Sequence, residues 1–147
     1  MPLVQSRVQI AAPVDTVYRV ARDVETFPDF MSDVQSIKVL EQQGERVLAN
    51  WVGVIPQFRL KVKWQQEDIW DPVAHTCKFR QTEGDYDEMY GEWRFLPDGD
   101  GTIFESDVTY EYTVPTLGPL VKKVVQGIVQ KNMDGVLAAI KKRAESA

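Results

Sequence analysis

One long amphipathic segment near the C-terminus constrains the fold more than any other feature of the sequence. Aliphatic residues recur at three- and four-residue steps across residues 116–145, which is the period of a helix with one apolar side. Gly118 and Pro119 suit the first turn of such a helix. The apolar stripe consists of Leu117, Val121, Val124, Val125, Ile128, Val129, Val136 and Ile140. Burying these side chains is worth roughly 10 to 20 kcal/mol, so we expect a wide surface, most simply a curved sheet, to cover the helix.

Two residues interrupt this apolar stripe. Asn132 lies near its middle and Gly135 lies within it, although a glycine inside a helix costs about 1 kcal/mol relative to alanine. A polar group and a missing side chain on the inward face fit a cavity beneath the helix. A satisfied buried amide and a close contact between helix and sheet are the alternative.

The rest of the chain predicts a meander of strands. Residues 3–10 alternate as a strand, and two short helices follow it. Pro13 opens the first, and Asp23 can cap the second, which Pro28 interrupts and restarts. Between residues 34 and 112, alternating segments are separated by turn residues at intervals of about ten. Strands joined by short turns pair antiparallel. We therefore expect one α+β domain over residues 1–147, with a curved antiparallel sheet of about seven strands wrapped around the long C-terminal helix.

Side chains with inward parity on these strands suggest a binding pocket. They are bulky aromatic rings, a thioether and a few polar groups, which are typical of small-molecule sites and also of solid cores. The predicted ligand-binding set, drawn from the strands and from the helix, is Trp64, Phe79, Gln81, Met89, Trp93, Ser106, Val108, Tyr110, Tyr112, Val121, Val125, Ile128 and Asn132. The facing of the strand around Trp51 is ambiguous, because small apolar residues occupy both of its alternating sets.

Two turns carry apolar residues that would flank the mouth of such a pocket. Ile55 and Phe58 lie in one turn, and Leu117 lies where the long helix begins. These residues would either gate the cavity or touch a membrane transiently while an apolar ligand is transferred. Ordinary packing beneath a loop is the alternative.

Composition excludes several classes of function. The chain of 147 residues carries a net charge of −5, which argues against nucleic-acid binding because phosphate contacts need clustered Lys and Arg. The single cysteine, Cys77, permits no intramolecular disulfide and no multi-cysteine metal site. The sequence shows neither a signal peptide nor a membrane span. We expect a cytoplasmic protein, and the sequence leaves its oligomeric state open.

Two groups of residues resemble a known family. Residues 23–34 and 36–40 (DVETFPDFMSDV and SIKVL) are similar to the opening motif of the polyketide cyclase and coenzyme Q-binding branch of the START-like, or Bet v1-like, superfamily. The second match comprises Glu83-Gly84, residues 91–95 and Gly101-Thr102. The resemblance implies the helix-grip fold, with a hydrophobic cavity between the sheet and the C-terminal helix. It implies no catalytic set, because the superfamily holds carriers, cyclases and proteins without known ligands.

The sequence contains no motif that fixes a reaction. It has no nucleophile elbow, no metal-binding histidine pair and no phosphate loop, so we expect no catalytic set, metal or cofactor. The leading hypothesis is binding or transport of a lipid, isoprenoid quinone or polyketide-like molecule. The alternative is a cyclase, aromatase or dehydratase in which a tyrosine or His75 moves protons. A further alternative is an interaction protein directed to ribosomes, with the contact made by Arg59, Lys61, Lys63, Lys78 and Arg80.

Overall fold

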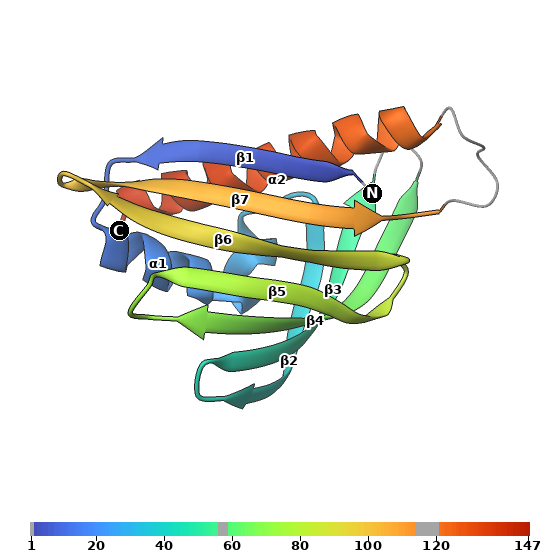
Figure 1. Cartoon of the computed structure of the whole chain (residues 1–147), viewed down its shortest axis with the longest axis horizontal. Coiled ribbons are helices and arrows are strands. Elements are labelled where there is room, and N and C mark those ends of the chain that lie inside the picture. The colour runs from blue at the N-terminus through green and yellow to red at the C-terminus, as the bar shows by residue number, and fades with distance from the viewer. Residues whose placement is uncertain (1, 56–58, 114–120) are drawn as a thin grey trace.

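The computed structural model describes residues 2–55, 59–113 and 121–147, and it confirms the predicted α+β fold (Figure 1). Two short helices, α1 (Val14–Arg22) and the 3-10 helix η1 (Val24–Asp29), follow the first strand, and the long helix α2 (Val121–Glu145) ends the chain. The strands are β1 (Leu3–Ile10), β2 (Val34–Gln43), β3 (Arg46–Ile55), β4 (Leu60–Asp71), β5 (Thr76–Gly84), β6 (Glu88–Asp98) and β7 (Gly101–Glu111).

All seven strands belong to one antiparallel sheet in the order β1-β7-β6-β5-β4-β3-β2. Each strand from β2 to β6 pairs with its successor in the chain, and β7 pairs with β1 on its other side. Two-residue turns close the β2–β3 and β6–β7 hairpins, and Gly44 and Gly99 open these turns with φ angles of +59°, a left-handed conformation that glycine adopts without steric cost. The meander therefore follows from local turn chemistry, and the two edges of the sheet are β1 and β2.

Helix α2 is anchored along the β1 edge of the sheet (Figure 1). The Lys141 ammonium donates to the carbonyl of Gln9 at 2.7 Å, and the Glu145 carboxylate accepts from the backbone N–H of Ala11 at 2.7 Å. Further along the helix, Gln130 donates to the carbonyl of Gln5 at 2.9 Å. The bonds to Gln5 and Gln9 use backbone groups of the edge strand β1, which would otherwise be open to pairing with another chain.

The C-terminal half of α2 covers a tightly packed core. Leu137 and Ile140 are buried there, where α1 contacts α2 and the β6–β7 part of the sheet. Phe95 and Phe104 stack at 4.6 Å between ring centroids and are at most 1% exposed. This end of the molecule is therefore solidly packed around these side chains.

Two predictions about the apolar stripe of α2 are wrong. The side chain of Val124 is exposed, and so is the position of Gly135, where an added Cβ would meet no atom within 4 Å. Gly135 is therefore not a site of close contact with the sheet and does not face a cavity. Each of these residues is adjacent in sequence to a residue of the inward face, and one step along a helix turns a side chain through about 100°. The predicted helix start at residues 116–119 lies outside the described residues.

Candidate functional site

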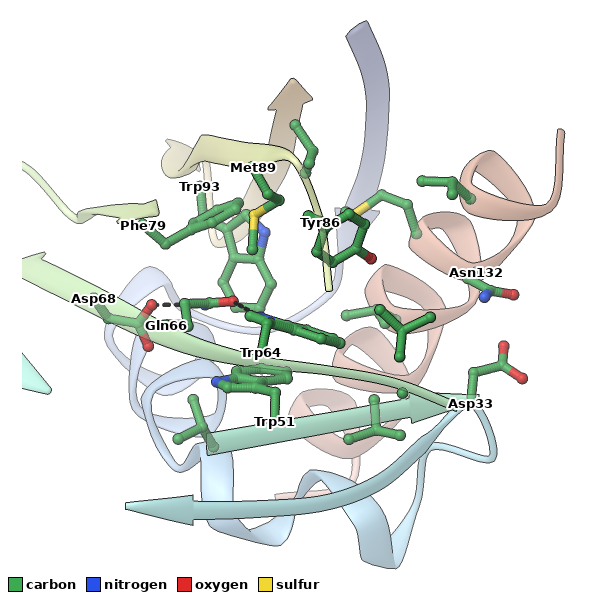
Figure 2. A pocket seen from close by; sticks show the side chains of 18 of the residues that line it. Asp33, Trp51, Trp64, Gln66, Asp68, Phe79, Tyr86, Met89, Trp93 and Asn132 are labelled. Atoms are coloured by element: carbon green, nitrogen blue, oxygen red, sulfur yellow. Dashed lines mark hydrogen bonds between the residues drawn. The ribbon is translucent and has the colours of Figure 1, made fainter. Parts of the chain in front are cut away.

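A cavity of about 160 Å³ lies between the sheet and the middle of α2. Figure 2 shows its walls: strands β3 to β6 contribute large aromatic side chains, and the helix closes the opposite side. All four tryptophans of the chain, Trp51, Trp64, Trp70 and Trp93, line it. This concentration of large, flat side chains around an internal space is what a site for a small apolar molecule requires.

The aromatic wall is built by contacts between neighbouring strands. Trp51 of β3 stacks on Trp64 of β4 with ring centroids 5.7 Å apart, and Tyr86 packs edge-on against Trp64 at 5.4 Å. Gly84 pairs with Trp64 in the β4–β5 ladder, and a Cβ at Gly84 would lie 2.5 Å from the Trp64 Cα. The absence of a side chain at Gly84, together with its φ of +148°, lets the two backbones approach and fixes the position of the Trp64 ring.

The structure brings about half of the predicted ligand-binding residues to the cavity. Ile55, predicted at the mouth, also lines the cavity and is buried. The residues of the predicted ligand-binding set that line it are Trp64, Phe79, Met89, Trp93, Val108 and Asn132.

Other predicted residues lie behind or beside the wall. Gln81 exchanges two hydrogen bonds with the backbone of Tyr86, at 2.9 and 3.1 Å, and so holds the β5–β6 loop. Ser106 is buried and donates to the Met133 sulfur at 3.1 Å. Tyr110, Tyr112, Val125 and Ile128 pack in the surrounding core. Phe58, Leu117 and the side chain of Val121 lie outside the described residues, so gating and membrane contact at the mouth stay predictions.

A chain of buried hydrogen bonds runs along the inner face of β4. The Trp64 indole Nε1 donates to the Gln66 Oε1 at 2.9 Å, and the Gln66 Nε2 donates to the Asp68 Oδ1 at 2.7 Å. The indole can only donate, so it fixes the Gln66 amide with its NH₂ group toward Asp68. Gln66 and Asp68 line the cavity, and the side chain of Asp68 is only 2% exposed. A carboxyl group is therefore held in a fixed position in an apolar cavity.

Burial changes the acidity of this carboxyl group. Loss of hydration raises the pKa of Asp68 to about 6 from its ordinary value of 3.8, while the hydrogen bond from Gln66 opposes that rise and the charge of Glu67 adds to it. Burial also raises the pKa of the neighbouring Cys77 thiol, which makes it a poor nucleophile at neutral pH. The carboxyl group of Asp68 can therefore exchange protons near neutrality.

Three indole N–H groups around the cavity are buried without a partner. They belong to Trp51, Trp70 and Trp93, and their Nε1 atoms make no hydrogen bond within the part of the chain that the structure describes. A buried donor without an acceptor costs about 1 to 3 kcal/mol. A ligand oxygen that reached one of these buried groups would relieve that cost.

A second polar pair lies at the other end of the cavity. With its amide nitrogen toward β2, Asn132 of α2 donates to the Asp33 carboxylate at 3.0 Å and to the Ile128 carbonyl at 3.3 Å. Figure 2 shows this pair on the opposite side of the aromatic rings from Gln66 and Asp68. The cavity therefore has polar side chains at both ends.

The sequence carried a signal for the residues that were missed. Buried positions of β4 alternate from Val62 to Trp70, so extending the predicted alternation beyond Trp64 places Gln66, Asp68 and Trp70 on the inner face. Their polarity hid this signal, because buried polar residues are uncommon. Tyr86 was missed for a different reason, since it sits between the exposed carboxylates of an acidic loop.

The other candidates lie away from the cavity. His75 is half-buried, and its Nε2 lies 3.0 Å from the Asp15 carboxylate, between α1 and the β4–β5 turn. The strand face that carries the predicted basic residues also carries an acid, since Glu67 accepts hydrogen bonds from both Arg46 and Arg80. No group of three or more His, Cys, Asp or Glu side chains could hold a metal ion within residues 2–55, 59–113 and 121–147. The helices in that same part of the chain include none that is long and apolar enough to span a bilayer.

Comparison with known proteins agrees with this architecture. A structure of TTHA0849 from Thermus thermophilus superposes with a TM-score of 0.93 at 36% identity, covering 99% of this chain and 98% of that one. A Zhui aromatase/cyclase from Streptomyces sp. R1128 superposes with a TM-score of 0.86 at 22% identity, covering 98% and 93%. A putative polyketide cyclase from Streptomyces cyaneus is 26% identical over 143 residues, 96% of this chain and 92% of its own.

Solved START superfamily structures also share the fold, including one from Mycobacterium smegmatis with a TM-score of 0.79 at 19% identity, covering 98% of this chain and 97% of that one. The family model described as polyketide cyclase/dehydrase and lipid transport matches residues 10–137. The match of this family model over most of the chain, on a fold shared with START superfamily structures, leads to one conclusion: this chain belongs to the polyketide cyclase/dehydrase and lipid transport family.

Proposed function

We propose that this protein binds a hydrophobic small molecule in the cavity between the sheet and α2. The observation that carries the proposal is the placement of all four tryptophans around an internal space of about 160 Å³. Of the candidate ligands, which are lipids, isoprenoid quinones and polyketide-like aromatics, the flat aromatic walls favour a planar ring system over an acyl chain. Desolvation of the ligand supplies most of the affinity.

A cavity-filling variant tests this proposal. Val129 lines the cavity, whereas Val124, on the same helix, is exposed. Val129→Phe should weaken binding of a bicyclic probe, 1-naphthol, by at least about tenfold because the new ring occupies the ligand's space. Val124→Phe should bind as the wild type does. Isothermal titration calorimetry measures both affinities, and thermal unfolding checks that both variants fold.

Equal affinity in the two variants would contradict binding in this cavity. Mass spectrometry of an organic-solvent extract of the purified protein provides an independent reading, because a resident ligand should appear in a stoichiometric amount. Its mass would also separate a polyketide-like aromatic from a lipid or a quinone.

A second candidate function is a dehydratase or cyclase activity, and the observation that favours it is Asp68. A general acid–base group works best when its pKa lies near the working pH, and burial raises the pKa of Asp68 to about 6. Burial raises the pKa of the Tyr110 hydroxyl as well, which disfavours Tyr110 as the proton-transferring tyrosine. His75 does not line the cavity.

Conversion of 3-hydroxy-1-tetralone to 1-naphthol and water tests this activity. The Asp68 carboxylate would take the proton from the carbon beside the ketone and return it to the departing hydroxyl group, and the dienone would then tautomerise to the phenol. We expect Asp68→Asn to slow turnover by at least about 100-fold, which is the usual contribution of a general acid–base group. Glu67→Gln removes a carboxylate from the adjacent position of β4 and should retain the wild-type rate. Absence of turnover in the wild type, or equal rates in both variants, would overturn this candidate.

A further inference from the structure

The Asp68 end of the cavity carries both kinds of hydrogen-bonding group. Gln66 holds one carboxylate oxygen of Asp68 at 2.7 Å and orients the group within the cavity wall. The side chains of Trp51, Trp70 and Trp93 line the same cavity, and their indole N–H groups are buried in its wall without acceptors among the described residues. Trp70 is the next inward-facing residue after Asp68 on β4. The cavity therefore offers an acceptor at Asp68, and the side chains of its wall carry donors that have no partner among the described residues.

These groups select among the polar substituents that an apolar ligand could carry. A carboxylate on the ligand would be repelled by Asp68, and an ammonium group could not accept from the indole N–H groups. A ketone or ether oxygen could accept from an indole but would give Asp68 no proton. A hydroxyl group does both, because its oxygen accepts while its O–H donates.

We propose that Asp68 is a specificity-determining residue that accepts a hydrogen bond from a phenolic or enolic hydroxyl group of the ligand, whose oxygen in turn accepts from a tryptophan indole of the cavity wall. The inference rests on the proposed binding function and defines the chemistry of the ligand at one end of the cavity. The Asn132–Asp33 pair at the opposite end is already joined within the protein. The hydroxyl-bearing end of the ligand is therefore directed toward β4.

A matched pair of probes isolates the hydroxyl proton. 1-Naphthol and 1-methoxynaphthalene share a ring system and an oxygen that can accept from an indole, but only the naphthol can donate. Hydrophobicity alone favours the ether, which carries an additional methyl group. At neutral pH we nevertheless expect calorimetry to show the naphthol binding to the wild type about tenfold more tightly, because hydrogen bonds to charged acceptors are strong.

Variants at position 68 then assign the preference. Asp68→Leu removes the acceptor and should reverse the preference in favour of the ether, and Asp68→Asn, which preserves shape, should reduce it toward equal affinity. Glu67→Gln, on the outer face of the same strand, should keep the tenfold preference. Equal binding of both probes by the wild type, or an unchanged preference in both Asp68 variants, would overturn the role of Asp68 and leave the binding function intact. If neither probe bound the wild type, the proposed binding function would itself fail.

Discussion

Truncating Phe104 to alanine should destabilise the protein by about 3 to 5 kcal/mol, the usual cost of removing a fully buried ring from a packed core. Phe104 is 0% exposed and contacts Phe95 at 4.6 Å and Trp93 at 5.2 Å between ring centroids. It lies in the solid end of the molecule, where aromatic partners surround it. Little relaxation can fill the space left behind, so both the transfer free energy and the cavity contribute.

Phe79→Ala provides the matched control for that measurement. Phe79 is 9% exposed and borders the cavity, so one side of its ring already lacks packed neighbours. Its truncation forfeits fewer dispersion contacts, and we expect a loss smaller by about 1 to 2 kcal/mol. Urea unfolding of both variants without ligand measures the difference. Equal losses would mean that the space around Phe79 is filled as densely as that around Phe104.

Replacing Asp68 with asparagine should stabilise the protein above about pH 6, with a gain that approaches 3 kcal/mol. The folded state raises the pKa of Asp68 to about 6 from 3.8, and each unit of pKa corresponds to about 1.4 kcal/mol. Because the pKa of Asp68 is higher in the folded state, ionisation does not lower the stability of the wild type at a pH below the unfolded-state pKa. As the pH rises toward the folded-state pKa, ionisation of the buried carboxyl group lowers the stability of the wild type. Asparagine has no charge to bury and avoids this loss at every pH. Any hydrogen-bonding group of the new asparagine amide that lacks a partner reduces this gain in stability.

Denaturant unfolding at about pH 4 and about pH 8 measures this effect, and the difference in unfolding free energy between variant and wild type should shrink to below about 1 kcal/mol at the lower pH.

Glu67→Gln is a control in which the change in stability should have the opposite sign. Hydrogen bonds from Arg46, and then from Arg80, lower the pKa of Glu67, so its charge stabilises the fold above its unfolded pKa and that stabilisation is lost on acidification. A gain for Asp68→Asn that did not change with pH would show that Asp68 is not the titrating group. A residue that lowers the stability of the folded protein is expected where a binding site is built at the expense of stability.

The order and type of the elements could be predicted from the sequence because they depend on local chemistry. Alternating apolar residues define strands, hairpin glycines such as Gly44 and Gly99 define turns, and the stripe containing Val125, Ile128 and Ile140 defines one long helix. Where the apolar pattern of α2 was locally ambiguous, the sequence did not show which residues face inward. Val124 and Gly135 sit beside the inward face of α2, and an apolar side chain or a glycine next to that face looks the same in sequence as one within it.

The sequence by itself determined the helix-grip fold and the supply of aromatic side chains, since periodicity and turn residues act over a few neighbours. The tertiary structure alone decided which side chains surround empty space and which fill the core. Trp51, Gln66, Asp68 and Tyr86 joined the cavity only when strands β3 to β6 came together, and Ser106 and Tyr110 joined the packed core. The physical reason is that a cavity is a property of packing between distant segments, and the acidity of Asp68 follows from the loss of water that this packing imposes.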